Sequence, residues 1–193
     1  MTALLHARSE GPFVPVADRR VLAVRWAQHT LAVGAVIVAI GTSDMYLGVG
    51  GVCELAVIDT NGQNLLDTLV NPQIPVTRAA NHFHQLTDGM LEGAPTFRAV
   101  LPDLLSVTAE RTVAAYHAGY VRSVVLGDCG KAGMDPDHLE DQQVWRCISQ
   151  ARSASVGHPD HHLPLTGGPR ALAACHAALQ VLRGIAADRA GSL

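Results

Sequence analysis

The sequence predicts an α/β fold with a mixed sheet, in which a three-strand antiparallel meander is flanked by helices. The β-branched run from Ala35 to Ile40, stopped by Gly41, is typical of a buried central strand. The dipeptide Asn61-Gly62 predicts a tight hairpin turn between two further strands, at 53–59 and 63–71. Beyond residue 72, helical and strand-like patterns alternate, which is typical of an α/β domain.

The elements around the meander are predicted from hydrophobic spacing. Residues 1–17 show no periodicity and are expected to be a loose lead-in. A helix is predicted from Asp18 to Val33, with Asp18 as its N-cap. Further along we expect an extended connector at 72–84, a helical turn at 87–91, an amphipathic helix at 96–108, a strand at 111–116, helices at 121–130 and 135–150, a loop at 158–168 and a final helix at 170–188.

Composition limits the classes of function. A length of 193 residues suits one domain, and 48% hydrophobic with 16% charged residues describes a globular protein. A net charge of −3 argues against a broad phosphate-binding surface, although a small basic cleft is compatible with it.

The sequence also bears on compartment. The apolar segment from Leu31 to Ile40 is too short to span a bilayer, and the N-terminus lacks a signal-peptide pattern. The four cysteines have no C-x-x-C spacing, so we expect reduced thiols and not a disulfide framework or a zinc site. We therefore expect a cytoplasmic protein without a membrane partner.

Four segments occur in an informative order. They are Leu66–Pro72, His84–Phe97 (with Met90 and Gly93-Ala-Pro-Thr-Phe97), Val113–Tyr120 and Gly167–Leu172. Together they resemble the DEDD-type (DEDDh) 3′–5′ exonucleases of the RNase H-like fold, especially actinobacterial proofreading-subunit-like members. The resemblance covers roughly residues 20–187. It implies a single exonuclease-like domain at 18–188, followed by a short tail at 189–193.

The resemblance implies a specific chemistry. The family's reaction uses two Mg²⁺ or Mn²⁺ ions held by four carboxylates, with a histidine as general base. The positions that match the five catalytic residues are Gly41, Ser43, Val121, Pro169 and Ala174. None of these side chains is a carboxylate or an imidazole, so we expect no catalytic residues, no metal ligands and no cofactor.

The prediction for function is a catalytically inactive, exonuclease-like protein, a pseudo-nuclease that acts by binding. Its partner would be a nucleotide or single-stranded nucleic acid, another protein, or a second copy of the chain. Stacking and hydrogen bonding can hold a nucleotide without metal. The resemblance implies these ligand-binding residues: Thr42, Leu47, His84, Tyr116, His117 and Tyr120.

Two alternatives stay open. A rescued metal-dependent exonuclease would need Asp44, which in a regular strand faces away from the expected acids unless a bulge turns it back. An enzyme with a new reaction could bind a transition metal through His158, Asp160, His161 and His162.

Two further acids are interpreted structurally. Glu54, in the second strand, is expected to be a buried structural partner. Asp128 is expected on the surface of a helix.

Overall fold

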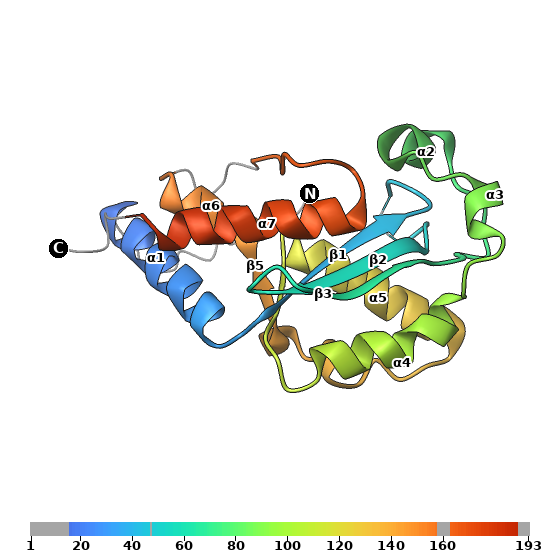
Figure 1. Cartoon of the computed structure of the whole chain (residues 1–193), viewed down its shortest axis with the longest axis horizontal. Helices are drawn as coiled ribbons and strands as arrows, with labels where there is room; N and C mark the ends of the chain where they lie inside the picture. Colours follow the sequence, from blue (N-terminus) through green and yellow to red (C-terminus); the bar gives the residue numbers. More distant parts are fainter. Residues whose placement is uncertain (1–15, 47, 158–162, 189–193) are drawn as a thin grey trace, which may run out of the picture.

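A computed structural model describes residues 16–46, 48–157 and 163–188 (Figure 1). Its centre is a five-stranded sheet in the order β3-β2-β1-β4-β5. The two halves of this sheet are built differently, because the first three strands are antiparallel and the last two run parallel to β1.

The predicted meander is present. It consists of β1 (Val36–Thr42), β2 (Val52–Asp59) and β3 (Asn64–Leu69). Gly62 has a φ of 93° in the turn between β2 and β3, a conformation that favours glycine. The pairing of β1 with β2 shifts register between Gly41 and Thr42, so the end of β1 is irregular where the candidate site begins.

The parallel half is short. The strands β4 (Val113–Ala115) and β5 (Trp145–Cys147) continue the sheet beyond β1. A helix connects β4 to β5, as parallel strands require.

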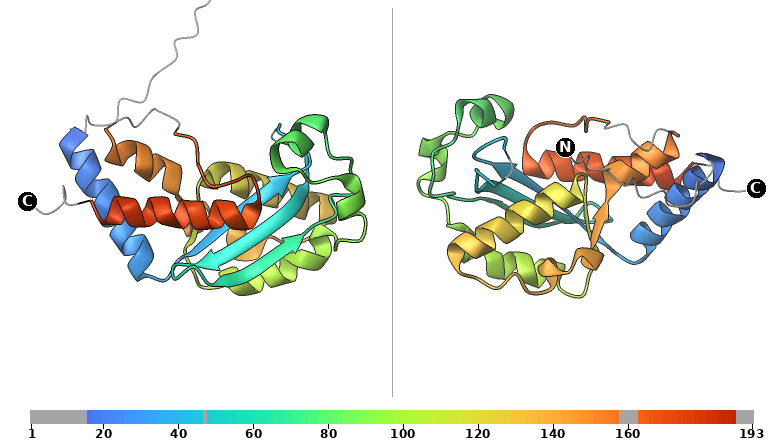
Figure 2. Two further views of the ribbon diagram at one scale, coloured as in Figure 1. Left: turned by 45° about the horizontal axis from the view of Figure 1, so that its top comes forward. Right: turned by 180° about the vertical axis from the view of Figure 1, so that it is seen from behind.

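Helices cover both faces of the sheet (Figure 2). On one face, α4 (Phe97–Thr108) and α5 (Ala118–Ala132) pack against alternate residues such as Val36, Val38 and Leu55. On the other face, α1 (Val16–Ala32), α6 (Ile148–Ser155) and α7 (Ala171–Ala186) enclose a second core around Ile37 and Ile58. The alternation of the strand residues between two cores explains why β1 and β2 are apolar almost throughout.

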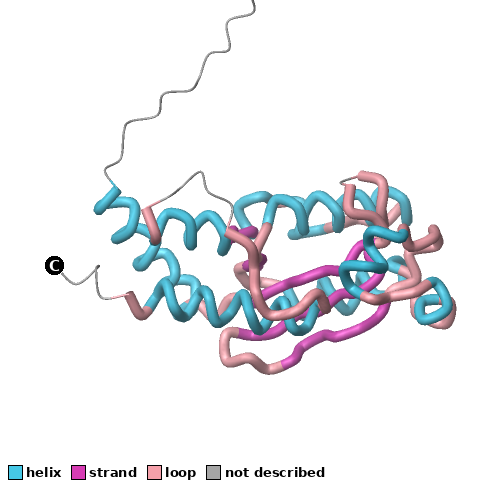
Figure 3. Tube along the Cα trace, turned by 90° about the horizontal axis from the view of Figure 1, so that it is seen from above, coloured by secondary structure: helices cyan, strands magenta, loops and turns pink. Residues whose placement is uncertain are grey.

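Two small helices lie beyond the carboxyl end of β1, at the end of the molecule opposite α1 and α6 (Figures 1 and 3). They are α2 (Arg78–His84) and α3 (Asp88–Leu91). The hydroxyls of Thr77 and Thr87 accept hydrogen bonds from backbone N–H groups in their first turns, which caps both helices.

Two expectations about elements were wrong. The connector predicted at 72–84 contains α2. The helix predicted at 135–150 is replaced by two 3₁₀ turns (Asp137–Glu140 and Gln142–Val144), by β5 and by the first residues of α6. A side-chain turn explains part of this, because the Asp141 carboxylate accepts the N–H of Gln143 and breaks a continuous helix.

The first helix also begins earlier than predicted, at Val16, so Asp18 lies in its first turn and is not its N-cap. The lead-in expected at 1–17 therefore overlaps α1, and the tail expected at 189–193 lies outside the described residues. Among the helices of the described ranges, none is long and apolar enough to cross a bilayer.

Candidate functional site

The carboxyl end of β1 is the meeting point of the four sequence segments. Gly41 is the register partner of Glu54 on β2. A Cβ atom on Gly41 would lie 3.3 Å from the Cβ of Glu54 and 3.5 Å from the Sγ of Cys53. The close approach of β2 therefore favours glycine at the position where the resemblance places the first catalytic acid.

Ser43, at the second expected acid position, is buried and committed to the loop. Its Oγ accepts the N–H of Gly51 at 2.9 Å, its own N–H donates to the carbonyl of Gly51, and its carbonyl accepts the N–H of Thr77. The side chain of Ser43 closes the β1–β2 loop, and its backbone carbonyl anchors the start of α2 to that loop.

Asp44 lies just beyond the irregular end of β1. Its Oδ1 accepts the backbone N–H of Tyr46 at 2.8 Å, and its carbonyl accepts the hydroxyl of Thr42. The register shift in this pair of strands falls between Gly41 and Thr42. The carboxylate of Asp44 is thus part of a local turn.

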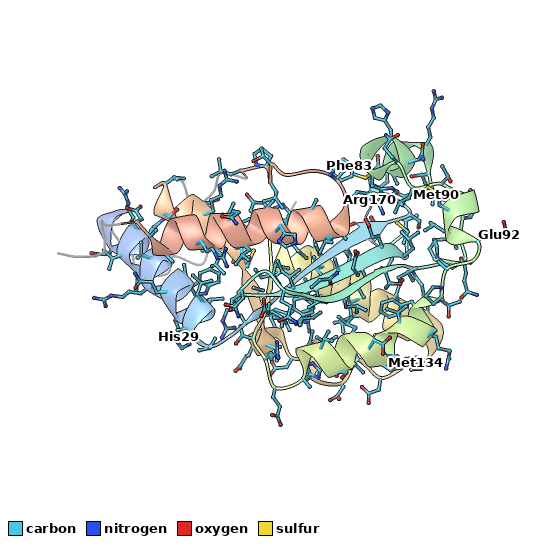
Figure 4. The ribbon with its side chains drawn as sticks, viewed as in Figure 1. His29, Phe83, Met90, Glu92, Met134 and Arg170 are labelled. Atoms are coloured by element: carbon cyan, nitrogen blue, oxygen red, sulfur yellow. The ribbon has the colours of Figure 1, made fainter. Side chains whose placement is uncertain are left out.

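Glu54 is the buried carboxylate of this region, and it is fully paired. Its Oε1 accepts the Nε of Arg170 at 2.9 Å and lies 2.7 Å from Nη2 of the same guanidinium, while Oε2 accepts the N–H of Ala171 at 2.9 Å. The role of structural partner predicted for Glu54 agrees with this geometry. The hydrogen bond that Arg170 donates to Glu54 raises the pKa of Arg170 above its ordinary value. Figure 4 shows Arg170 at the end of α7 nearest α2.

The start of α7 carries two expected catalytic positions. Pro169 is exposed, and Ala174 is half-buried in the first turn of α7, where its N–H donates to the carbonyl of Arg170. Gly167 precedes them with a φ of 153°, and a Cβ there would lie 2.4 Å from the Cβ of Ala177. The two glycines of the segment therefore allow the chain to turn tightly into α7.

The remaining expected acid position, Val121, lies in α5 and is buried in the core between the sheet and the helices α4 and α5. The adjacent Tyr120 reaches back to β1, with its Oη 3.0 Å from Oγ1 of Thr42. Since the single hydroxyl proton of Thr42 can go to the carbonyl of Asp44, Tyr120 is then the donor to Thr42.

His84 is buried at 2% exposure and belongs to the scaffold. Its Nδ1 accepts the N–H of Leu86 at 3.0 Å, so Nε2 carries the proton and donates to the carbonyl of Thr42 at 3.0 Å. The Sγ of Cys53 lies 3.7 Å from the same Nε2. His84 holds α2 against β1 and is not exposed to a ligand.

Tyr116 and His117, which follow β4, form side-chain hydrogen bonds with residues of α6. The buried Tyr116 donates its hydroxyl to the carbonyl of Leu163 at 2.6 Å and accepts Nη1 of Arg152 at 2.8 Å. The half-buried His117 has its Nδ1 3.1 Å from Oγ of Ser149. Of the residues expected to bind a ligand, His117 and Tyr120 are therefore the most accessible described ones.

Several sequence-predicted residues lie outside the described ranges. They are Leu47, His158, Asp160, His161 and His162. Within the described ranges, no group of three or more His, Cys, Asp or Glu side chains is placed to hold a metal ion.

The expectation for Asp128 was wrong, since this residue is 5% exposed. Its Oδ2 accepts the N–H of Val52 at 2.7 Å, and its Oδ1 pairs with Nζ of Lys131 at 2.9 Å. Lys131 also donates to the carbonyl of Gly50. Asp128 thereby joins α5 to the start of β2, and both of its carboxylate oxygens have hydrogen-bond partners.

No protein-family profile matches the sequence. An uncharacterized exonuclease of Escherichia phage 186 is 29% identical over 86 residues, which are 45% of this chain and 44% of the phage protein. The chain therefore spans less than half of the length of this relative.

Solved exonuclease structures share the fold. Exonuclease I of E. coli in complex with a dT13 oligonucleotide has a TM-score of 0.63 at 10% identity, covering 80% of this chain and 41% of that one. Exonuclease X in complex with 5′ overhanging duplex DNA has a TM-score of 0.52 at 19% identity, covering 76% of this chain and 89% of that one. These matches confirm the predicted exonuclease-like α/β fold and support the resemblance to DEDD-type 3′–5′ exonucleases.

Proposed function

We propose that this exonuclease-like protein does not cleave nucleic acid and instead binds the end of a single strand, or a nucleotide, at the carboxyl end of β1. The observation that carries the proposal is the pairing of Glu54. The buried carboxylate nearest Gly41 has both oxygens occupied by Arg170 and Ala171.

The donor set does not fit a pair of divalent cations. Magnesium and manganese prefer several carboxylate oxygens. Gly41, Val121 and Ala174 have no side-chain oxygen, and the hydroxyl of Ser43 is used within the loop. The guanidinium of Arg170 already supplies the positive charge next to Glu54. No catalytic step is therefore assigned to a metal.

Cys53 does not substitute as a ligand. Burial, together with the neighbouring Glu54, raises the pKa of its thiol to about 12. The thiol is thus protonated at neutral pH, whereas metal binding requires the thiolate.

Binding is supported by the groups that remain accessible. The half-buried ring of Tyr120 and the imidazole of His117 follow β4, and both can stack on or hydrogen-bond to a base. The side chain of Arg170 is 44% exposed, so N–H groups of its guanidinium that do not contact Glu54 can donate to a phosphate. The DNA complexes of the similar exonuclease structures support a nucleic-acid ligand.

The test uses a 3′-labelled single-stranded oligonucleotide. We expect no trimming with Mg²⁺ or Mn²⁺, and binding by fluorescence anisotropy that EDTA leaves unchanged. Tyr120→Ala should weaken binding about tenfold through lost stacking, while Tyr120→Phe, which keeps the ring, should weaken it much less.

Three results would overturn the proposal. They are metal-dependent trimming that is lost in a Thr42/Asp44 double variant, absence of binding, or equal binding by wild type and Tyr120→Ala. Capture of a protein partner without oligonucleotide binding would favour the protein-binding alternative.

A further inference from the structure

A groove separate from the β1 site lies between α1, β5 and α6, at the end of the molecule remote from α2 and α3 (Figure 1). Its volume is about 420 Å³, within the range of small-molecule sites. Its lining residues are Arg19, Leu22, Ala23, Trp26, Trp145, Arg146, Cys147, Gln150, Ala151 and Ala154.

The walls of the groove are largely apolar. Leu22 on α1 is 57% exposed, and the half-buried Trp26 lies one helical turn further along. Across the groove, α6 contributes Ala151 and Ala154, whose small side chains leave space that a larger residue would fill. An apolar ligand here would cover Leu22 and the indole of Trp26.

Arg146 supplies a positive charge that the described residues do not neutralise. Its Nη1 donates to the carbonyls of Gln143 and Trp145, which are uncharged acceptors. No carboxylate of the described ranges forms an ion pair with it. Arg19 also lines the groove and has an interaction partner of its own. The groove therefore combines an apolar wall with a cationic margin.

We propose that this groove binds a small amphipathic anion, in which an apolar chain or ring carries a carboxylate. The apolar part would lie against Leu22 and Trp26, and the carboxylate would meet Arg146. A guanidinium suits a carboxylate because it can donate two parallel hydrogen bonds. This site is separate from the nucleic-acid site proposed at Tyr120.

Trp26 lines the groove and is half-buried, so its fluorescence reports on occupancy of the groove. The indole of Trp145, the other tryptophan of the sequence, is buried in the core on the α4 and α5 face, where its Nε1 donates to the carbonyl of Leu139. We would titrate the protein with 4-phenylbutyrate, its neutral amide and the cation 4-phenylbutylamine. A saturable change in emission is expected with the carboxylate. The amide should bind about tenfold more weakly, since a hydrogen bond to a charged group is lost.

Two kinds of variant locate the site. Arg146→Gln keeps donors for the two carbonyls but removes the charge, and it should weaken 4-phenylbutyrate binding about tenfold without affecting the amide. Arg183→Gln is the matched control, because Arg183 is an exposed arginine that donates to the carbonyl of Thr60, outside the groove. Ala154→Leu should fill the groove and abolish binding of both compounds, with circular dichroism to confirm folding.

The proposal would be overturned by equal responses to the three compounds, or by equal effects of Arg146→Gln and Arg183→Gln. A folded Ala154→Leu variant that still binds would also overturn it. So would a stable dimer in solution whose tryptophan emission does not respond to 4-phenylbutyrate, because a second copy would then cover the groove.

Discussion

The guanidinium of Arg170 forms a 2.7 Å ion pair with the carboxylate of Glu54, whose side chain is only 4% exposed. Arg170→Ala should lower the free energy of unfolding by about 2 kcal/mol, as measured by urea denaturation. The expected loss is below that of a fully buried pair, because the arginine side chain is 44% exposed and solvent screens it. Arg183→Ala is the control, and an equal effect of the two substitutions would contradict the prediction.

His84→Ala should destabilise the protein by about 2–3 kcal/mol, because it leaves the N–H of Leu86 and the carbonyl of Thr42 without their buried partner. His82→Ala, on the same helix but exposed, should change stability by less than about 0.5 kcal/mol. Thermal melts of the two variants provide the comparison. If they melt together, His84 does not anchor α2.

Two glycines, one just before α7 and one near its end, should respond in opposite directions to alanine. Gly167→Ala places a Cβ 2.4 Å from the Cβ of Ala177 at a φ of 153°, and should cost about 1–3 kcal/mol. Gly184→Ala, inside α7 with open space around it, should stabilise by about 0.5–1 kcal/mol. Denaturation midpoints measure both changes, and a gain for Gly167→Ala would contradict the described turn.

Burial raises the thiol pKa values of Cys53 and Cys175 from 9.0 to about 12. The folded state therefore keeps protons that the unfolded state releases above pH 9. Stability should be fully present below pH 9 and fall as pH rises towards 12, by about 1 kcal/mol per thiol between pH 8 and pH 10. Urea denaturation at these two pH values tests this.

The matched variant for the thiol prediction is Cys175→Ala. It should lose less stability than wild type between pH 8 and pH 10, because one titrating thiol is absent. An identical pH dependence in the two proteins would show that the thiol pKa of Cys175 is not raised in the folded state.

Local patterns predicted the parts of the fold that local interactions determine. The apolar run of β1 and the turn at Asn61-Gly62 were sufficient for the meander. By contrast, α2 is a polar, seven-residue helix that depends on the Thr77 cap and on the contact of His84 with β1. A three-residue strand such as β5 has too few residues to show an alternating pattern.

The sequence indicated which positions to consider at the end of β1, but it did not indicate the partners that their side chains contact. Glu54 was expected to be a buried structural partner, yet the identity of Arg170 as its partner depends on how α7 meets the sheet. Asp128, by contrast, was expected on the surface of a helix and is buried. Its partner, the N–H of Val52, is 76 residues away and cannot be inferred from local spacing.

The packing of α1 against α7 has a consequence for the order of folding. Arg20 pairs with Asp188, 168 positions away, and Gln28 donates to the carbonyl of Ala186. The meander can form from neighbouring segments, but the apolar side of α1 has no cover until α6 and α7 arrive. The core on that face is thus closed by contacts of high sequence separation, which are slow to form. We infer that this core completes late, and that partly folded chains expose α1 to association with other molecules.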